Sequence, residues 1–175
     1  MKWKRTELLT NENVWLDSWD ADEEIFVRMF RECWARLPSS MTQKIGAYWN
    51  SFDGGDVKVE LSNMWKDAVD SFAQVRKGGY AIRFDSDSMP VFPRKAAIAV
   101  IVHELAHVYQ KAIGRQPGGV NEVENEDEAN QLMREWGFER KCLDFVKSLL
   151  SLGMEFSEAC AAASKHSDCQ CVSAE

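Results

Sequence analysis

The sequence has no apolar run long enough to cross a lipid bilayer. Its longest apolar run, from Ala96 to Val102, has seven residues, whereas a transmembrane helix needs about 20. The short basic cluster from Lys2 to Arg5 is followed by a polar stretch and not by the hydrophobic core of a signal peptide. We therefore expect no signal peptide and no membrane partner.

Positive charge is also scarce. The chain has 21 Lys and Arg against 28 Asp and Glu, for a formal net charge of −7. Proteins that bind nucleic acid usually present basic surfaces, and the cluster at residues 2–5 is too small to reverse this balance. We expect no nucleic-acid partner.

The cysteines show no pairing pattern. They are five in number, an odd count, and they are scattered along the chain. Without a secretory signal, such cysteines are typical of reduced thiols, which predicts a cytoplasmic protein. The five are Cys33, Cys142, Cys160, Cys169 and Cys171.

The composition is that of an ordinary globular protein. The 175 residues are 45% hydrophobic and 28% charged, enough for one domain with a buried core. No internal repeat interrupts the chain. We expect an N-terminal arm at residues 1–20, a main domain at 21–153, and a C-terminal helix with a frayed tail at 154–175.

Hydrophobic periodicity predicts an α+β fold that is mostly helical. Alternating apolar residues predict strands at 57–61 and 80–84. Residues 63–75 fit either a helix or the first arm of a hairpin, and a short helix running into a strand is preferred. Apolar stripes and end signals predict helices at 20–38, 39–49, 94–113, from 125, 143–152 and 156–163.

The chain is organised around the stretch from Ala96 to Tyr109, which contains the sequence His-Glu-Leu-Ala-His. The apolar run predicts a helix buried nearly all round. His103 and His107 are four residues apart, so they project from one face of that helix and can grip one metal ion. Glu104 lies beside the first histidine, where a carboxylate reaches water without coordinating the metal.

This short motif also arises by chance, as two surface histidines beside a glutamate. Two observations argue against chance here: the chain has only three histidines, two of them in this pair, and the motif ends a strongly apolar helix. The metal interpretation is therefore preferred, with zinc as the expected cofactor.

Catalytic zinc sites use three protein ligands. The remaining histidine, His166, lies far away in a polar tail, so a glutamate on a second helix is the expected third ligand. Glu126 is on the same stripe as Ala129 and Met133 and should face the core, where zinc would offset the cost of burying its charge. The three competing glutamates are Glu122, expected before the helix begins, and Glu124 and Glu128, expected to face water.

His103-Glu104-Leu105-Ala106-His107 followed by Asn125-Glu126-Asp127-Glu128-Ala129-Asn130 resembles the gluzincin clan of zinc metallopeptidases. The downstream form is similar to small bacterial and phage-borne peptidases of the ImmA/IrrE type. The resemblance covers mainly residues 79–138. It implies a compact zincin-like fold, with a small, mostly antiparallel sheet packed on the active-site helix.

The resemblance also implies roles for individual residues. His103, His107 and Glu126 would bind zinc, which lowers the pKa of bound water to about 7 and polarises the scissile carbonyl. Glu104 would take the proton from water and deliver it to the leaving amine. Asn130 would hydrogen-bond a ligand histidine, although the clan often has Asp there, so ligand basicity would be lower.

By the same resemblance, the strand at residues 80–84 would be the edge strand along which an extended peptide or protein substrate lies. Tyr80 and Ile82 would then contact substrate, although an ordinary sheet strand explains this segment equally well. No residue is placed as the clan's further transition-state stabiliser. Tyr80 and Tyr109 were considered for that role, and a structural role is preferred for both.

The sequence offers two weaker metal-site candidates, and neither has the ligand set that its metal needs. His166, Cys169 and Cys171 supply three soft ligands where a closed site needs four. The acidic run from Glu122 to Glu128 lacks the spacing of an EF-hand loop, and a solvated helix start explains it.

The leading hypothesis is a cytoplasmic zinc-dependent endopeptidase. The alternative is a zinc-binding regulatory or protein-interaction module that retains the site with little or no peptidase activity. The presence of Glu104 favours the enzyme, because a structural zinc site needs no base.

Overall fold

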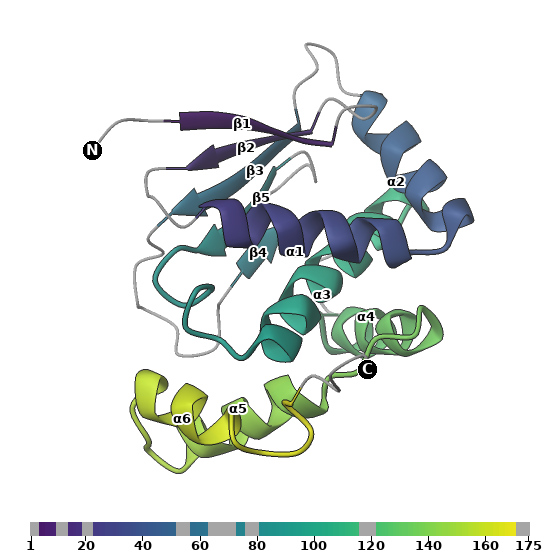
Figure 1. Ribbon diagram of the computed structural model, residues 1–175. Helices are drawn as coiled ribbons and strands as arrows, with labels where there is room; N and C mark the ends of the chain where they lie inside the picture. Colours follow the sequence, from purple (N-terminus) through teal and green to yellow (C-terminus); the bar gives the residue numbers. More distant parts are fainter. Residues whose placement is uncertain are drawn as a thin grey trace, which may run out of the picture.

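The computed structural model describes residues 4–9, 14–18, 23–51, 57–62, 73–75, 81–115 and 122–170. Within these ranges, helices pack against a single sheet, and the α+β class is confirmed (Figure 1). The strands are β1 (Lys4–Leu9), β2 (Val14–Ser18), β3 (Val57–Ser62), β4 (Ala73–Val75) and β5 (Ala81–Asp85). The helices are α1 (Glu23–Arg36), α2 (Ser39–Asn50), α3 (Arg94–Ala112), α4 (Glu122–Glu135), α5 (Lys141–Ser151) and α6 (Phe156–Ala163).

The sheet has the strand order β1-β2-β3-β5-β4. The central pairings, β2 with β3 and β3 with β5, are parallel, whereas the outer pairings are antiparallel. The expectation of a mostly antiparallel sheet is therefore wrong, and the sheet is mixed. Single-strand periodicity does not carry the direction of the neighbouring strand, which the connections between strands decide.

The described residues of the predicted arm, 4–9 and 14–18, are strands of the main sheet. Among them, β1 and β2 make one side of the sheet, and β2 pairs directly with the predicted strand β3. Leu8, Val14 and Leu16 are almost completely buried. These side chains belong to the main core, so the described residues of the predicted arm pack as part of the main domain.

The predicted edge strand is internal. β5 lies between β3 and β4, and both of its sides carry backbone pairing. Within the described sheet, β4 is the outer strand next to β5. The strand expected at the end of residues 63–75 is therefore confirmed. The upstream helix predicted from residue 63 lies outside the described residues.

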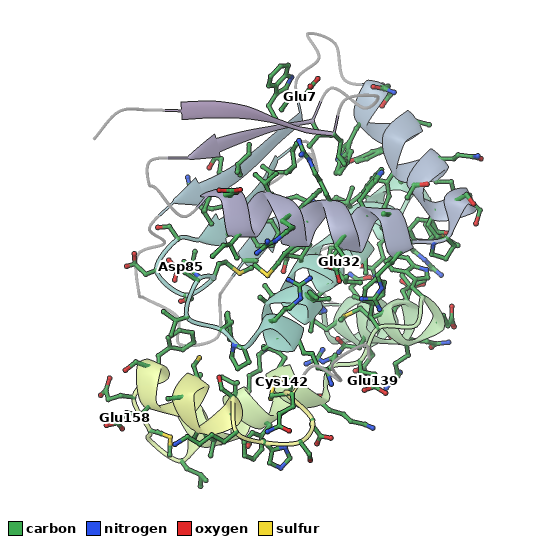
Figure 2. All side chains as sticks on the ribbon, viewed as in Figure 1. Glu7, Glu32, Asp85, Glu139, Cys142 and Glu158 are labelled. Atoms are coloured by element: carbon green, nitrogen blue, oxygen red, sulfur yellow. A yellow bond between two sulfur atoms is a disulfide. The ribbon has the colours of Figure 1, made fainter. Side chains whose placement is uncertain are left out.

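Helix α1 lies across one face of the sheet (Figure 1). The rings of Phe26 and Phe84 join α1 to β5 with centroids 5.0 Å apart, and Arg31 Nε donates to the Leu8 carbonyl at 3.0 Å. Glu32 on α1, labelled in Figure 2, pairs with Arg94 at the start of α3. On this helix Phe26 is buried, whereas the neighbouring Ile25 is 48% exposed.

Helix α3 is the buried centre of the domain, as predicted. Every residue from Ala96 to Val102 is at most 9% exposed, and burial of a Val or Ile side chain contributes about 1.5–3 kcal/mol. Pro93 precedes the first turn, where its missing N–H costs nothing. At the other end, Gly114 adopts φ +84°, and Arg115 N–H donates to the Gln110 carbonyl at 2.8 Å, closing a Schellman motif.

Helices α5 and α6 form a pair beyond α3, and Phe156 on α6 packs edge-on against Phe92. A disulfide joins Cys142, labelled in Figure 2, to Cys169 after α6. The expectation of reduced thiols is therefore wrong for these two residues, and so is that of a frayed tail as far as residue 170. The cytoplasmic location inferred from reduced cysteines loses its basis, because disulfides persist in oxidising compartments.

Cys33 and Cys160 are free and buried. Burial raises the pKa of Cys33 to about 12 and that of Cys160 to about 11. Both therefore stay protonated and unreactive near neutral pH. In the part of the chain that is described, no helix has the length and apolar character to cross a membrane.

Candidate metal centre

Three side chains from two helices converge at the C-terminal half of α3. His103 Nε2 lies 3.1 Å from His107 Nε2 and 3.1 Å from Glu126 Oε2. His107 Nε2 lies 3.1 Å from Glu126 Oε1. The i, i+4 spacing on α3 brings the two imidazoles together, and packing of α4 against α3 brings the carboxylate to them.

This donor set fits a small divalent ion. Zinc binds imidazole nitrogen and carboxylate oxygen at about 2.0–2.2 Å, so ligand atoms on a tetrahedron are about 3.3 Å apart. The three observed separations of 3.1 Å are close to that value. Among the described residues, this is the one cluster of His, Cys, Asp and Glu suited to a metal. Two histidines and a carboxylate are also a donor set that catalytic zinc sites use.

Glu126 was chosen as the third ligand because it was expected to face the core, and that expectation is wrong. Its side chain is 51% exposed, whereas those of His103 and His107 are 16% and 12% exposed. The inner face of α4 is instead lined by Ala129 and Met133. Glu126 lies one turn earlier on the same side of the helix, at the rim, so the cluster is open to solvent on the side of α4.

The other glutamates behave differently from one another. Helix α4 begins at Glu122, three residues before the predicted start. Glu124 is exposed, as expected. Glu128 was also expected to face water, but it is only partly exposed because it accepts a hydrogen bond from Gln110 and pairs with Arg115.

The electrostatics of the cluster favour a charged carboxylate beside imidazole. Hydrogen bonds from His103 and His107 lower the pKa of Glu126 well below its ordinary value. Burial lowers the pKa of His107, but its hydrogen bonds to Glu126 and Gln110 and the charge of Glu104 outweigh burial and raise it. Without an ion, a proton must therefore occupy the space among these atoms.

Glu104 is buried beside the cluster and is 7% exposed. Its charge acts on His107, whose pKa it helps to raise. It also acts on Lys111. Burial lowers the pKa of that lysine, and the charge of Glu104 offsets part of the decrease. Glu104 is therefore a buried carboxylate close to the histidines that is not part of the three-residue cluster.

Gln110 is a member of the site that sequence reasoning missed. Its side chain is fully buried, and Oε1 lies 2.8 Å from His107 Nδ1. Its Nε2 donates to the Asn125 carbonyl at 2.8 Å and to Glu128 Oε2 at 3.0 Å. One signal was available: a polar residue three positions after His107 lies on the same helix face, in a helix that is otherwise buried.

Asn130 does not form the expected bond to a ligand histidine. Its Oδ1 accepts from Arg140, which also binds Asp144 at 2.9 Å. A guanidinium is a stronger donor than an imidazole N–H, so the amide turns toward the charge. His103 Nδ1 is buried and has no hydrogen-bond partner within the described part of the chain.

The predicted substrate residues do not line the cluster. Ile82 is completely buried in β5, so its side chain faces the core, and that assignment is wrong. Tyr80 lies outside the described residues. Tyr109 is 7% exposed, packs on Trp136 and accepts from Lys44 Nζ at 3.5 Å. These contacts agree with the structural role preferred for Tyr109.

The rejected soft-metal site has no thiolate to offer at Cys169, which is disulfide-bonded. His166 stacks on Phe145 with ring centroids 4.1 Å apart, and its Nδ1 lies 3.6 Å from Asp168. Cys171 lies outside the described residues. His166 is thus a packing residue of the C-terminal segment.

The chain was compared with known proteins in three ways. No family model, no curated protein and no solved structure matches it. Functional inference therefore rests on the geometry of the cluster and on the motif residues themselves.

Proposed function

We propose that this chain is a gluzincin-type zinc metallopeptidase that hydrolyses peptide bonds. The observation that carries the proposal is the convergence of His103, His107 and Glu126 within 3.1 Å, with Glu104 buried beside them. The resemblance of the two motifs to that clan supports the same conclusion. The proposal includes the zincin-like fold, with zinc held by His103, His107 and Glu126.

Zinc bound there would supply a Lewis acid that acidifies water and polarises a peptide carbonyl. Glu104 then acts as general base, removing a proton from the attacking water. As the C–N bond of the substrate breaks, Glu104 returns that proton to the leaving amine. The partial burial of the histidines and the burial of Glu104 keep these steps in a weakly screened environment, while the exposed side of Glu126 is where the substrate enters.

The substrate class follows from the sheet. Because β5 is internal, its edges are already paired and it cannot take up a peptide. The peptide-binding role is therefore assigned to β4, the outer strand of the described sheet next to β5. Helix α3 packs against β4. An extended peptide added to an outer strand is held by backbone hydrogen bonds, which favours unfolded segments over one particular sequence.

A zinc-binding interaction module is the second candidate. Half exposure of Glu126 supports it, because an open cluster also suits a ligand group from a partner protein. The buried Glu104 favours the enzyme, since a module without catalysis gains nothing from a carboxylate held in that position.

The deciding experiment compares the parent with Glu104→Gln on a denatured protein substrate. Glu124→Gln, an exposed carboxylate on α4, is the matched control. The enzyme predicts that Glu104→Gln keeps the fold and the zinc but loses about 100-fold or more in turnover, while Glu124→Gln is unaffected. Equal turnover in parent and Glu104→Gln would refute the assigned base. A zinc-loaded parent that cleaves nothing across a broad peptide library would support the module.

A further inference from the structure

We infer that Gln110 is a positioning residue that holds His107 in the one tautomer able to bind a metal through Nε2. The functional value of this arrangement rests on the proposed metal centre, whereas the hydrogen bonds of Gln110 are present in the metal-free structure. Gln110 is fully buried between α3 and α4 and uses both ends of its amide.

Two acceptors decide which end of the amide faces His107. Nε2 of Gln110 has two N–H groups, and it lies 2.8 Å from the Asn125 carbonyl oxygen and 3.0 Å from Glu128 Oε2. Arg115 pairs with the other oxygen of Glu128 at 3.4 Å, which holds this acceptor in place. A flipped amide would press Oε1 against two oxygen acceptors in a buried space, which costs the hydrogen bonds of all three groups.

The orientation of the amide fixes the proton on His107. Oε1 of Gln110 only accepts, so Nδ1 of His107, 2.8 Å away, must donate. In a neutral ring the lone pair is then on Nε2, the atom that faces His103 and Glu126. Ligand histidines commonly need such a fixed acceptor on the other nitrogen. His103 has none within the described residues, so Gln110 acts on one of the two ligands.

The same side chain also places the third ligand. Asn125 directly precedes Glu126, so the bond from Gln110 to the Asn125 carbonyl holds that turn of α4 against α3. The Schellman motif that begins at the Gln110 carbonyl also ends α3 at this point. One buried amide therefore couples the orientation of His107 to the position of Glu126.

The test is the His107 tautomer in metal-free protein, read from long-range proton–nitrogen correlation spectra recorded at increasing pH until the nitrogen shifts themselves report a neutral ring. Assignment is simple because the chain has three histidines. Gln110→Met removes both functions, and Gln131→Met, an exposed residue bonded to Glu135, is the matched control.

We expect the parent and the control to carry the proton on Nδ1, and Gln110→Met to populate the Nε2-protonated form. Zinc affinity should fall about 10- to 100-fold in Gln110→Met and remain unchanged in the control. An unchanged tautomer in Gln110→Met overturns the inference. If Gln110→Met does not fold, Glu128→Ala removes one acceptor that orients the amide, and it must also populate the second tautomer.

The outcomes for the metal centre are separate. A parent with the proton on Nδ1 that binds no zinc would defeat the proposed function and leave the positioning role intact. A parent that binds zinc tightly but carries its metal-free His107 proton on Nε2 would defeat the positioning role alone.

Discussion

Glu126 Oε2 lies 3.1 Å from His103 Nε2, although the two residues are 23 positions apart in the chain. Each reaches the other from a different helix, and the Glu126 side chain stays half exposed. Water already solvates a half-exposed carboxylate, so no metal is needed to offset a cost of burying its charge. Its approach to two imidazoles is better explained by an ion or a proton that the three groups share.

The first prediction concerns that carboxylate. Glu126→Ala should lower zinc affinity by more than about 100-fold, because it removes a direct ligand, a larger effect than loss of an outer partner. Glu124→Ala should leave the affinity unchanged, and Glu128→Ala should lower it about 10-fold through loss of the Gln110 contact. Competition against a calibrated chelator ranks the three. Equal affinities across the series would show that zinc, if bound, is held elsewhere.

The second prediction concerns metal content. Protein purified without chelators should contain one zinc ion per chain. The ligand atoms of two histidines and a carboxylate already lie within 4.8 Å of one another. His103→Ala should lose it. His166→Ala, which alters a histidine that stacks on Phe145, should retain it. Elemental analysis decides, and zinc that survives His103→Ala would count against this centre.

The third prediction concerns pH and metal-free protein. The lowered pKa of Glu126 means that its contribution to stability is present above the ordinary carboxyl value of 4.5 and is lost as pH falls through the lowered pKa. The raised pKa of His107 means that its contribution is present below the ordinary imidazole value of 6.5 and is lost as pH rises through the raised pKa.

The stability difference between the parent and Glu126→Gln should therefore be largest between these two ordinary values. It should stay below about 1 kcal/mol, because Glu126 is half exposed and water screens the pair. Urea unfolding in the presence of chelator across this range measures it. A difference that keeps growing at alkaline pH would contradict the assigned pairing.

The fourth prediction concerns the disulfide. Replacing Cys142 and Cys169 by Ala together should lower the free energy of unfolding by about 3 kcal/mol, because the bond closes a loop spanning 27 positions. Zinc affinity should not change, since neither cysteine contacts the cluster. Cys160→Ala, which alters a free buried thiol, is the control. Alkylation of both thiols in unreduced protein would show that the bond is absent.

Local periodicity was sufficient for the parts of the site that lie within one helix. The i, i+4 spacing of His103 and His107 requires only that residues 94–112 be helical, and the apolar run ensures that. The stripe on α4 likewise singled out Glu126 over its neighbours, although the side chain is at the rim and not in the core. The end of α3 at Gly114 followed from the one residue type that adopts positive φ without strain.

The tertiary structure decided everything that depends on neighbours distant in sequence. It made residues 4–9 and 14–18 strands of the main sheet, put β4 outside β5, and paired Cys142 with Cys169. It also turned Asn130 toward Arg140 and Gln110 toward His107. Strand order, cysteine pairing and the direction of an amide are set by non-local contacts, and no periodicity within a single segment carries that information.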